Sequence, residues 1–198
     1  MATNPSTMNL SEAIKAVAPH VGRDKSLPVL TNVRIVNGTV SATDRYTLAL
    51  VTLAPAELDP RIDVLLSPDD VKQGIVSITP NETGVPTLTF ANGSTKPATV
   101  PLPEETGYSG EFPDLQKFSD SMSAKITEDN TDRIDAFAVN LDYLARFHGK
   151  HVASAANRRS KPTPIFTLGA DATKPIRATY SDFPEYVGFI VPIRVSAV

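Results

Sequence analysis

Residues 27–53 read LPVLTNVRIVNGTVSATDRYTLALVTL, a run rich in β-branched and other apolar residues. Such runs, separated by turn residues, predict β-strands. We expect strands at Val29–Asn37, Thr39–Asp44 and Thr47–Leu53. Asn37-Gly38 joins the first two, and Asn-Gly is the strongest short signal for a hairpin. The run therefore predicts a three-stranded antiparallel meander.

A short helix is expected before this meander, over Asn9–Ala18. Asn9 can cap its first turn together with Glu12, and Pro19 ends it. The apolar residues recur at the spacing of one helix face, namely Leu10, Ala13, Ile14 and Val17. This face needs a sheet to cover it.

The unit of one helix and a meander recurs twice further along the chain. Helices are predicted from Ser67 to Val76 and from Asn140 to His148. Gly149 ends the second helix, whose apolar face contains Leu141, Leu144 and Ala145. The strands predicted around them are Ile62–Leu66, Thr87–Ala91, Ala98–Leu102, Ile134–Val139, Ile165–Gly169, Pro175–Tyr180 and Tyr186–Val195. Residues 103–133 are polar and predict a linker. Within it, four apolar residues could form one face of a short helix, namely Phe112, Leu115, Phe118 and Met122. The repeat predicts an α+β fold in which each helix packs on an antiparallel β-meander.

The composition excludes several classes of protein. The chain has 198 residues, no cysteine, and a net charge of −3 from 19 basic and 22 acidic residues. Disulfide scaffolds, zinc ribbons and thiol nucleophiles are therefore excluded. No apolar run reaches the ~18 residues of a membrane span, and residues 1–10 do not resemble a signal peptide. We therefore expect no membrane association. Because the net charge is −3, a basic surface would have to be confined to one face of the molecule.

Catalytic and metal sites are not indicated. His148 and His151 flank a glycine that ends the predicted helix, and neither has a Cys or carboxylate partner near it in the sequence. Asp69-Asp70 is explained by its place at a helix N-terminus. Residues 107–110, GYSG, lack the spacing and the leading strand of a nucleophile elbow. We expect no enzyme, no cofactor and no metal.

Four motifs resemble the bacterial DNA polymerase III sliding clamp, the beta clamp. They are Leu27-Pro28-Val29-Leu30, the ATDRYTLA run at 42–49, Phe112-Pro113-Asp114, and the ending from Tyr186 through Pro192-Ile193-Arg194-Val195. Their order and spacing, together with the helix-plus-meander repeat, make the set more specific than any one motif. The resemblance implies DNA-clamp-like repeats in two domains. Residues 1–118 resemble the clamp's middle domain, with two units, and 119–198 resemble part of its last domain, with one clear and one eroded unit.

The number of units sets the expected assembly. A clamp chain of this family has three domains of two units each, whereas this chain has three units and an eroded fourth. A ring of twelve units needs three copies if the eroded unit counts, and four if it does not. We expect a homo-oligomer and favour a trimer, because the two-domain chains of this superfamily close as trimers.

The resemblance implies a processivity factor that encircles double-stranded DNA without reading its sequence. Basic residues on or beside the helices would then face phosphates. A single Lys or Arg in such a place is about as often a plain solvent-facing residue. The candidates are Lys15, Arg23, Lys25, Lys72, Arg146, Lys150, Arg158, Arg159 and Lys161.

The resemblance implies a second site, a hydrophobic pocket for short peptides of DNA polymerase and other replication proteins. By residue match its candidates are Leu30, Thr43, Asp44, Tyr46, Leu48, Val191, Pro192, Ile193 and Arg194. At least half of the apolar members could equally be core strand residues. Arg45-Tyr46-Thr47 stand where the family often has Gly-His-Arg, so the peptide preference can differ.

Two other hypotheses stay open. A clamp-derived interaction protein could keep the pocket without forming a ring, and bind or compete for replication factors. The eroded unit favours it, since an incomplete domain leaves a sheet edge to be covered. The third hypothesis is a structural α+β domain. The resemblance implies the bacterial cytoplasm or nucleoid and allows a clamp loader as partner, and a compact phage genome would suit the first two hypotheses.

Overall fold

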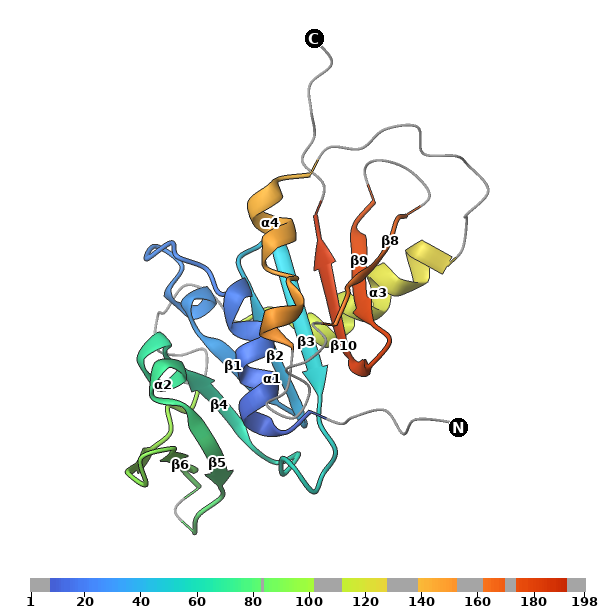
Figure 1. Ribbon diagram of the computed structural model, residues 1–198. Helices are drawn as coiled ribbons and strands as arrows, with labels where there is room; N and C mark the ends of the chain where they lie inside the picture. The colour runs from blue at the N-terminus through green and yellow to red at the C-terminus, as the bar shows by residue number, and fades with distance from the viewer. Residues whose placement is uncertain are drawn as a thin grey trace, which may run out of the picture.

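A seven-stranded antiparallel sheet forms the centre of the molecule (Figure 1). The computed structural model describes residues 8–82, 84–101, 112–127, 139–152, 162–169 and 174–191. The strand order is β4-β1-β2-β3-β10-β9-β8. The strands are β1 (Val33–Val36), β2 (Thr39–Thr43), β3 (Thr47–Thr52), β4 (Asp63–Leu66), β8 (Ile165–Thr167), β9 (Ile176–Tyr180) and β10 (Phe183–Ile190). Because β3 pairs with β10, with Leu48 opposite Phe189, segments 1–118 and 119–198 share one sheet.

The predicted meander is present as β1, β2 and β3. Asn37 and Gly38 have φ values of 50° and 73°, which is the geometry of a type I′ hairpin turn. The first strand is shorter than predicted, because Pro28–Thr31 form the 3₁₀ helix η2. Pro28 suits the first turn of a helix, since its ring fixes φ and its missing N–H is not needed there.

A smaller sheet contains β5 (Ile75–Thr79), β6 (Thr87–Phe90) and β7 (Thr95–Pro97), in that order. The helix before it, α2 (Pro68–Gln73), is shorter than predicted because Gly74 has a φ of 75° and ends it. The prediction of a strand at Ala98–Leu102 is wrong within the described residues. The third strand begins directly after the Asn92-Gly93 turn, and Thr99 contributes only one bridge to Leu65.

Two helices cover one face of the central sheet (Figure 1). The first, α1 (Leu10–Val17), has the predicted capping box between Asn9 and Glu12, and its predicted apolar stripe is buried. The second, α4 (Leu141–Ala145), is capped by Asn140 as predicted but ends three residues early. Leu144 packs against the core as predicted, whereas Leu141 is 76% exposed and Ala145 is exposed, so the predicted burial of these two is wrong.

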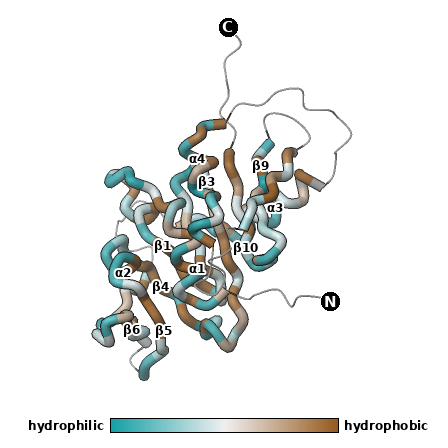
Figure 2. Tube along the Cα trace, in the orientation of Figure 1, coloured by the Kyte–Doolittle hydropathy of each residue, from teal (hydrophilic) through white to brown (hydrophobic). Residues whose placement is uncertain are grey.

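A third helix, α3 (Leu115–Thr127), covers the opposite face of β3 and β10. Leu48 and Leu50 point to α3, whereas their neighbours Ala49 and Val51 join the core on the α1 side. This stretch was predicted as a linker with one short helical stripe, and the stripe extends into a thirteen-residue helix. Hydrophobic residues accordingly run along the central strands, while α2 and the outer turns are hydrophilic (Figure 2).

A buried aromatic cluster ties β10 to the segments that follow α1 and α4. His20, the last residue of the 3₁₀ helix η1 (Ala18–His20), lies 3.3 Å from the Tyr186 hydroxyl through Nε2. The ring of Phe147 meets the His20 ring edge-on at 4.6 Å. A Cβ atom at Gly188 would lie well inside contact distance of Phe147 Cε1, so glycine makes room for that ring.

None of the helices in the described segments is long and apolar enough to cross a membrane. The predicted strand Ile134–Val139 lies outside the described residues except for Val139.

Candidate functional site

The turn between β2 and β3 is built by the side chains of the ATD motif. Asp44 Oδ1 accepts hydrogen bonds from the backbone N–H groups of Tyr46 at 3.0 Å and Thr47 at 2.7 Å. Thr43 Oγ1 donates to the Thr47 carbonyl at 2.8 Å and accepts from the Arg45 N–H at 3.1 Å. The motif is therefore explained locally, because the side chains of an Asp and a Thr close this turn.

The other oxygen of Asp44 reaches across the molecule to α4. Arg146 Nη1 donates to Asp44 Oδ2 at 2.6 Å and to Thr47 Oγ1 at 2.7 Å. The side chains of Arg146 and Asp44 are only 20% and 11% exposed. Beside them the rings of Tyr46 and Tyr143 are stacked, with centroids 5.6 Å apart. This contact fixes the turn against a helix about 100 residues further along the chain.

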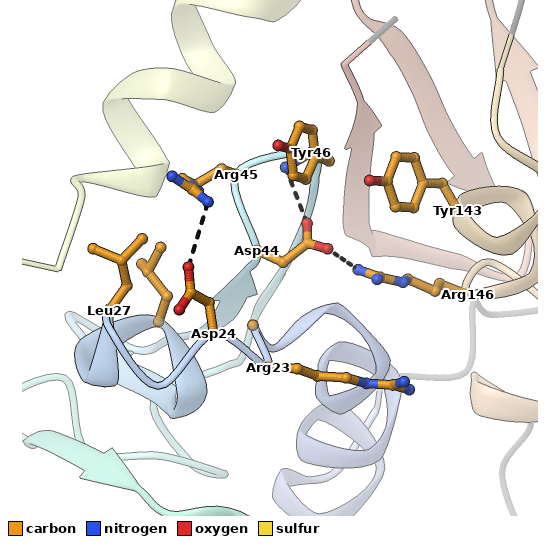
Figure 3. A pocket seen from close by; sticks show the side chains of 10 residues that line it. Arg23, Asp24, Leu27, Asp44, Arg45, Tyr46, Tyr143 and Arg146 are labelled. Atoms are coloured by element: carbon orange, nitrogen blue, oxygen red, sulfur yellow. Dashed lines mark hydrogen bonds and ion pairs between the residues drawn. The ribbon is translucent and has the colours of Figure 1, made fainter. Parts of the chain in front are cut away.

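A cleft of about 170 Å³ opens beside this ion pair (Figure 3). It lies between the loop after α1, the β2–β3 turn and α4. Its polar lining is Arg23, Asp24, Asp44, Arg45 and Arg146, and its remaining lining is Gly22, Leu27, Leu30, Tyr46 and Tyr143.

The rim of the cleft carries exposed charges. Arg45 Nη2 lies 3.8 Å from Asp24 Oδ2, and both side chains are about half exposed. Hydrogen bonds from the Ser26 hydroxyl and N–H lower the pKa of Asp24, so it is ionised at neutral pH. Partial burial, and then the charge of Asp44, raise the pKa of Tyr143, which stays a neutral phenol. The cleft thus combines a partly apolar floor with a charged rim.

Three residues of the predicted peptide set line the cleft, namely Leu30, Asp44 and Tyr46. Thr43 is buried within the turn, and Val191 donates its N–H to the Tyr46 carbonyl at 2.8 Å. Leu48 lies on the opposite face, 4% exposed beneath α3, and we remove it from the candidate site. Pro192, Ile193 and Arg194 lie outside the described residues.

The predicted DNA-facing set is dispersed. The exposed members are Lys15, Arg23, Lys25, Lys72 and Lys150, and Arg23 also lines the cleft. Arg146 is engaged by Asp44, and Arg158, Arg159 and Lys161 lie outside the described residues. The helices α1, α2 and α4 do not carry an excess of basic residues. Within them Lys15 and Lys72 are outnumbered by four acids, which are Glu12, Asp69, Asp70 and Asp142.

Two cleft residues that the sequence did not suggest for it are Tyr143 and Arg146. Both were placed on or beside a predicted helix, but nothing local connects that helix with a turn near residue 45. His148 Nδ1 accepts a hydrogen bond from the Lys150 N–H, and the described part of the chain contains no cluster of three potential metal ligands.

Comparison with solved structures places this fold among bacterial sliding clamps. The DNA polymerase III beta subunit of Thermotoga maritima matches 99% of this chain and 68% of its own, with a TM-score of 0.57 and 15% identity. That of Borrelia burgdorferi, in complex with a natural product, matches 99% and 66%, at 0.57 and 10%. The sliding clamp of Bartonella birtlesii, bound to griselimycin, matches 94% and 64%, at 0.55 and 15%. Neither a protein-family model nor a curated protein matches the sequence.

The chain therefore has the fold of bacterial DNA sliding clamps, and the predicted resemblance is confirmed at that level. The chain spans about two thirds of the length of those clamps. A likeness at 10–15% sequence identity shows the fold alone, because one fold can host different functions.

Proposed function

We propose that this chain is a sliding-clamp-like accessory protein of DNA replication that holds a short peptide of a replication protein in the cleft beside Asp44. The observation that carries the proposal is the position of this cleft on a clamp fold, at the turn where the sequence motif predicted a peptide pocket. Such a protein works by tethering and needs no catalytic group, cofactor or metal.

The size of the cleft supports a peptide rather than a small-molecule substrate. Pockets that enclose a small molecule usually measure ~300 to 1,000 Å³, and this one is about 170 Å³. That volume suits one or two side chains of an extended partner. Leu27 and Leu30 offer apolar contacts, and the exposed ring of Tyr46 offers the amphipathic surface that is typical of binding hot spots.

Peptide binding is tested by titrating a fluorescently labelled clamp-binding peptide and following polarisation. Tyr46→Ala removes a ring that is 47% exposed, so it should spare the fold and weaken binding about tenfold or more. Val76→Ala is the matched control, because Val76 is 50% exposed on β5 and does not line the cleft. Equal affinities of wild type and Tyr46→Ala would remove the cleft from the binding site.

The second part of the proposal is a ring of three copies around double-stranded DNA. It is supported by the clamp fold and by the count of helix-plus-meander units in the sequence. Sedimentation velocity at micromolar concentration should give about 64 kDa, three times the 21.2 kDa chain. Protein loaded on nicked circular DNA should then be released when the circle is cut. A monomer under these conditions contradicts the ring.

One observation favours a second candidate, a clamp-derived protein that binds replication factors without encircling DNA. The helices that would face DNA carry more acids than bases within the described residues. Both candidates bind the peptide. Sedimentation and retention on circular DNA separate them, because the second candidate sediments as a monomer and is not retained on circular DNA. In either form we expect a cytoplasmic or nucleoid protein.

A further inference from the structure

Arg45 occupies a backbone position that normally requires glycine. It is the second of the three residues between β2 and β3 and the first central residue of the turn from Asp44 to Thr47, and its φ is 80°. In a hairpin turn whose first central residue is the only one with positive φ, glycine is favoured at that residue, because a Cβ atom would crowd the backbone. Asn37 is the one other non-glycine residue with positive φ in the described part of the chain, and asparagine tolerates this geometry. The Arg45 side chain is therefore kept at a conformational cost.

The interactions of Arg45 within the molecule do not repay this cost. Its guanidinium lies 3.8 Å from Asp24, and the two side chains are 55% and 52% exposed. Exposed ion pairs at such a distance contribute little to stability. Its contact with the Tyr46 ring is long, at 5.9 Å. Its backbone N–H donates to Thr43 Oγ1, which a glycine would do equally well. Strain that folding does not explain points to function.

The guanidinium is placed to meet a ligand. Figure 3 shows Arg45 at the cleft above Leu27 and Asp24, while the Arg23 side chain, which also lines the cleft, extends away from Arg45. Asp44 and Arg146 neutralise each other and are largely buried. The exposed charged side chains that remain in the lining are Arg23, Asp24 and Arg45, and Arg45 is the guanidinium that lies beside Asp24. Because the Arg45 guanidinium has five N–H donors and its contact with Asp24 is exposed, it can donate to a ligand carboxylate for which Asp24 is a competitor.

We infer that Arg45 is a specificity residue that selects peptides in which a carboxylate stands next to an apolar side chain. The carboxylate binds the Arg45 guanidinium, and the apolar side chain packs against Leu27 and Leu30 in the cleft. This inference rests on the proposed function and adds the charge of the ligand to it. Asp24 competes with the ligand for Arg45, so its removal strengthens the interaction.

The test uses two labelled clamp-binding peptides that differ only in a Glu or a Gln next to their hydrophobic residues. Wild type should bind the Glu peptide about three- to tenfold more tightly, as expected for a partly exposed charge-assisted contact. Arg45→Gly should bind both peptides equally while its melting temperature stays the same or rises, because glycine relieves the turn. Asp24→Asn should widen the preference, and 0.5 M salt should narrow it.

The outcomes separate this inference from the proposed function. If wild type binds both peptides with equal affinity, or if Arg45→Gly keeps the preference for Glu, the role of Arg45 is wrong while the cleft stands. If wild type binds neither peptide, both are wrong. Val76→Ala serves as the control, since it lies outside the cleft and should keep the full preference for the Glu peptide.

Discussion

Breaking the ion pair between Arg146 and Asp44 should destabilise the protein more than breaking a similar pair elsewhere. Arg146→Met keeps an apolar side chain at this position and removes the guanidinium, with its two hydrogen bonds to Asp44 and Thr47 and its contact with the Tyr143 ring. Asp44 is left as a carboxylate that is 11% exposed, with one oxygen without its donor. Such a charge is costly, because water cannot replace the lost partner.

The magnitude follows from burial. Removing one partner of a fully buried pair costs about 3 to 5 kcal/mol. Here Asp44 Oδ1 keeps its three donors and the pair retains some exposure, so we expect about 2 to 3 kcal/mol. For a chain of this length that loss lowers the melting temperature by roughly 4 to 12 °C.

The matched control is Arg34→Met. Arg34 pairs with Asp63 at 2.7 Å, but Asp63 is 45% exposed and can be solvated when its partner is lost. That variant should lose no more than about 1 kcal/mol. Urea unfolding at pH 7, followed by circular dichroism, measures both. Equal losses for the two variants would refute the reasoning. The double variant Arg146→Met/Asp44→Asn should recover part of the loss, because an amide is cheaper to bury than a charge.

Three further predictions concern the core. Burial lowers the pKa of His20 from 6.5 to about 3, so below pH 6.5 the unfolded chain takes up a proton that the folded chain does not. Stability should fall by about 1.4 kcal/mol per pH unit between those values, and urea unfolding at pH 7 and 5 should show a smaller fall for His20→Gln. Gly188→Ala should cost about 1 to 3 kcal/mol by overpacking against Phe147, and Phe147→Leu in the same chain should recover part of it in thermal melts. Leu115→Ala should cost about 2 to 3 kcal/mol in urea if α3 is part of the core, against almost nothing for the exposed Gln116→Ala.

Local signals in the sequence were enough for the elements that local chemistry specifies. Asn37-Gly38 fixes the hairpin between β1 and β2, and the capping box of Asn9 and Glu12 fixes the start of α1. Gly74 ends α2 earlier than predicted, because a residue in the left-handed region breaks the helix before the apolar pattern does. Such errors concern boundaries and leave the order of elements intact.

The missed features depend on distant parts of the chain. The sequence of α3 is polar enough to predict a linker, and its helix is stabilised by the apolar surface of Leu48, Leu50 and Phe189. Only some of the cleft residues could be predicted, because the others come from a distant part of the chain. Leu30, Asp44 and Tyr46 lie in or beside motifs, whereas Tyr143 and Arg146 reach the site only after β3 pairs with β10. Hydrophobic periodicity describes one helix or strand at a time, so it does not show that the turn near residue 45 and the helix with Tyr143 lie together.

The sharing of one sheet by both ends of the chain has a consequence for binding. Because β3 and β10 pair over five residues, the turn at Asp44 and the helix that carries Tyr143 belong to one folded unit. The walls of the cleft are therefore set by folding, and a ligand does not have to order them. Preorganisation of this kind lowers the entropic cost of association, which matters most for a short peptide with few contacts. Arg146→Met should accordingly weaken peptide binding even though Arg45, Leu27 and Leu30 are untouched, since it loosens the wall that those residues face.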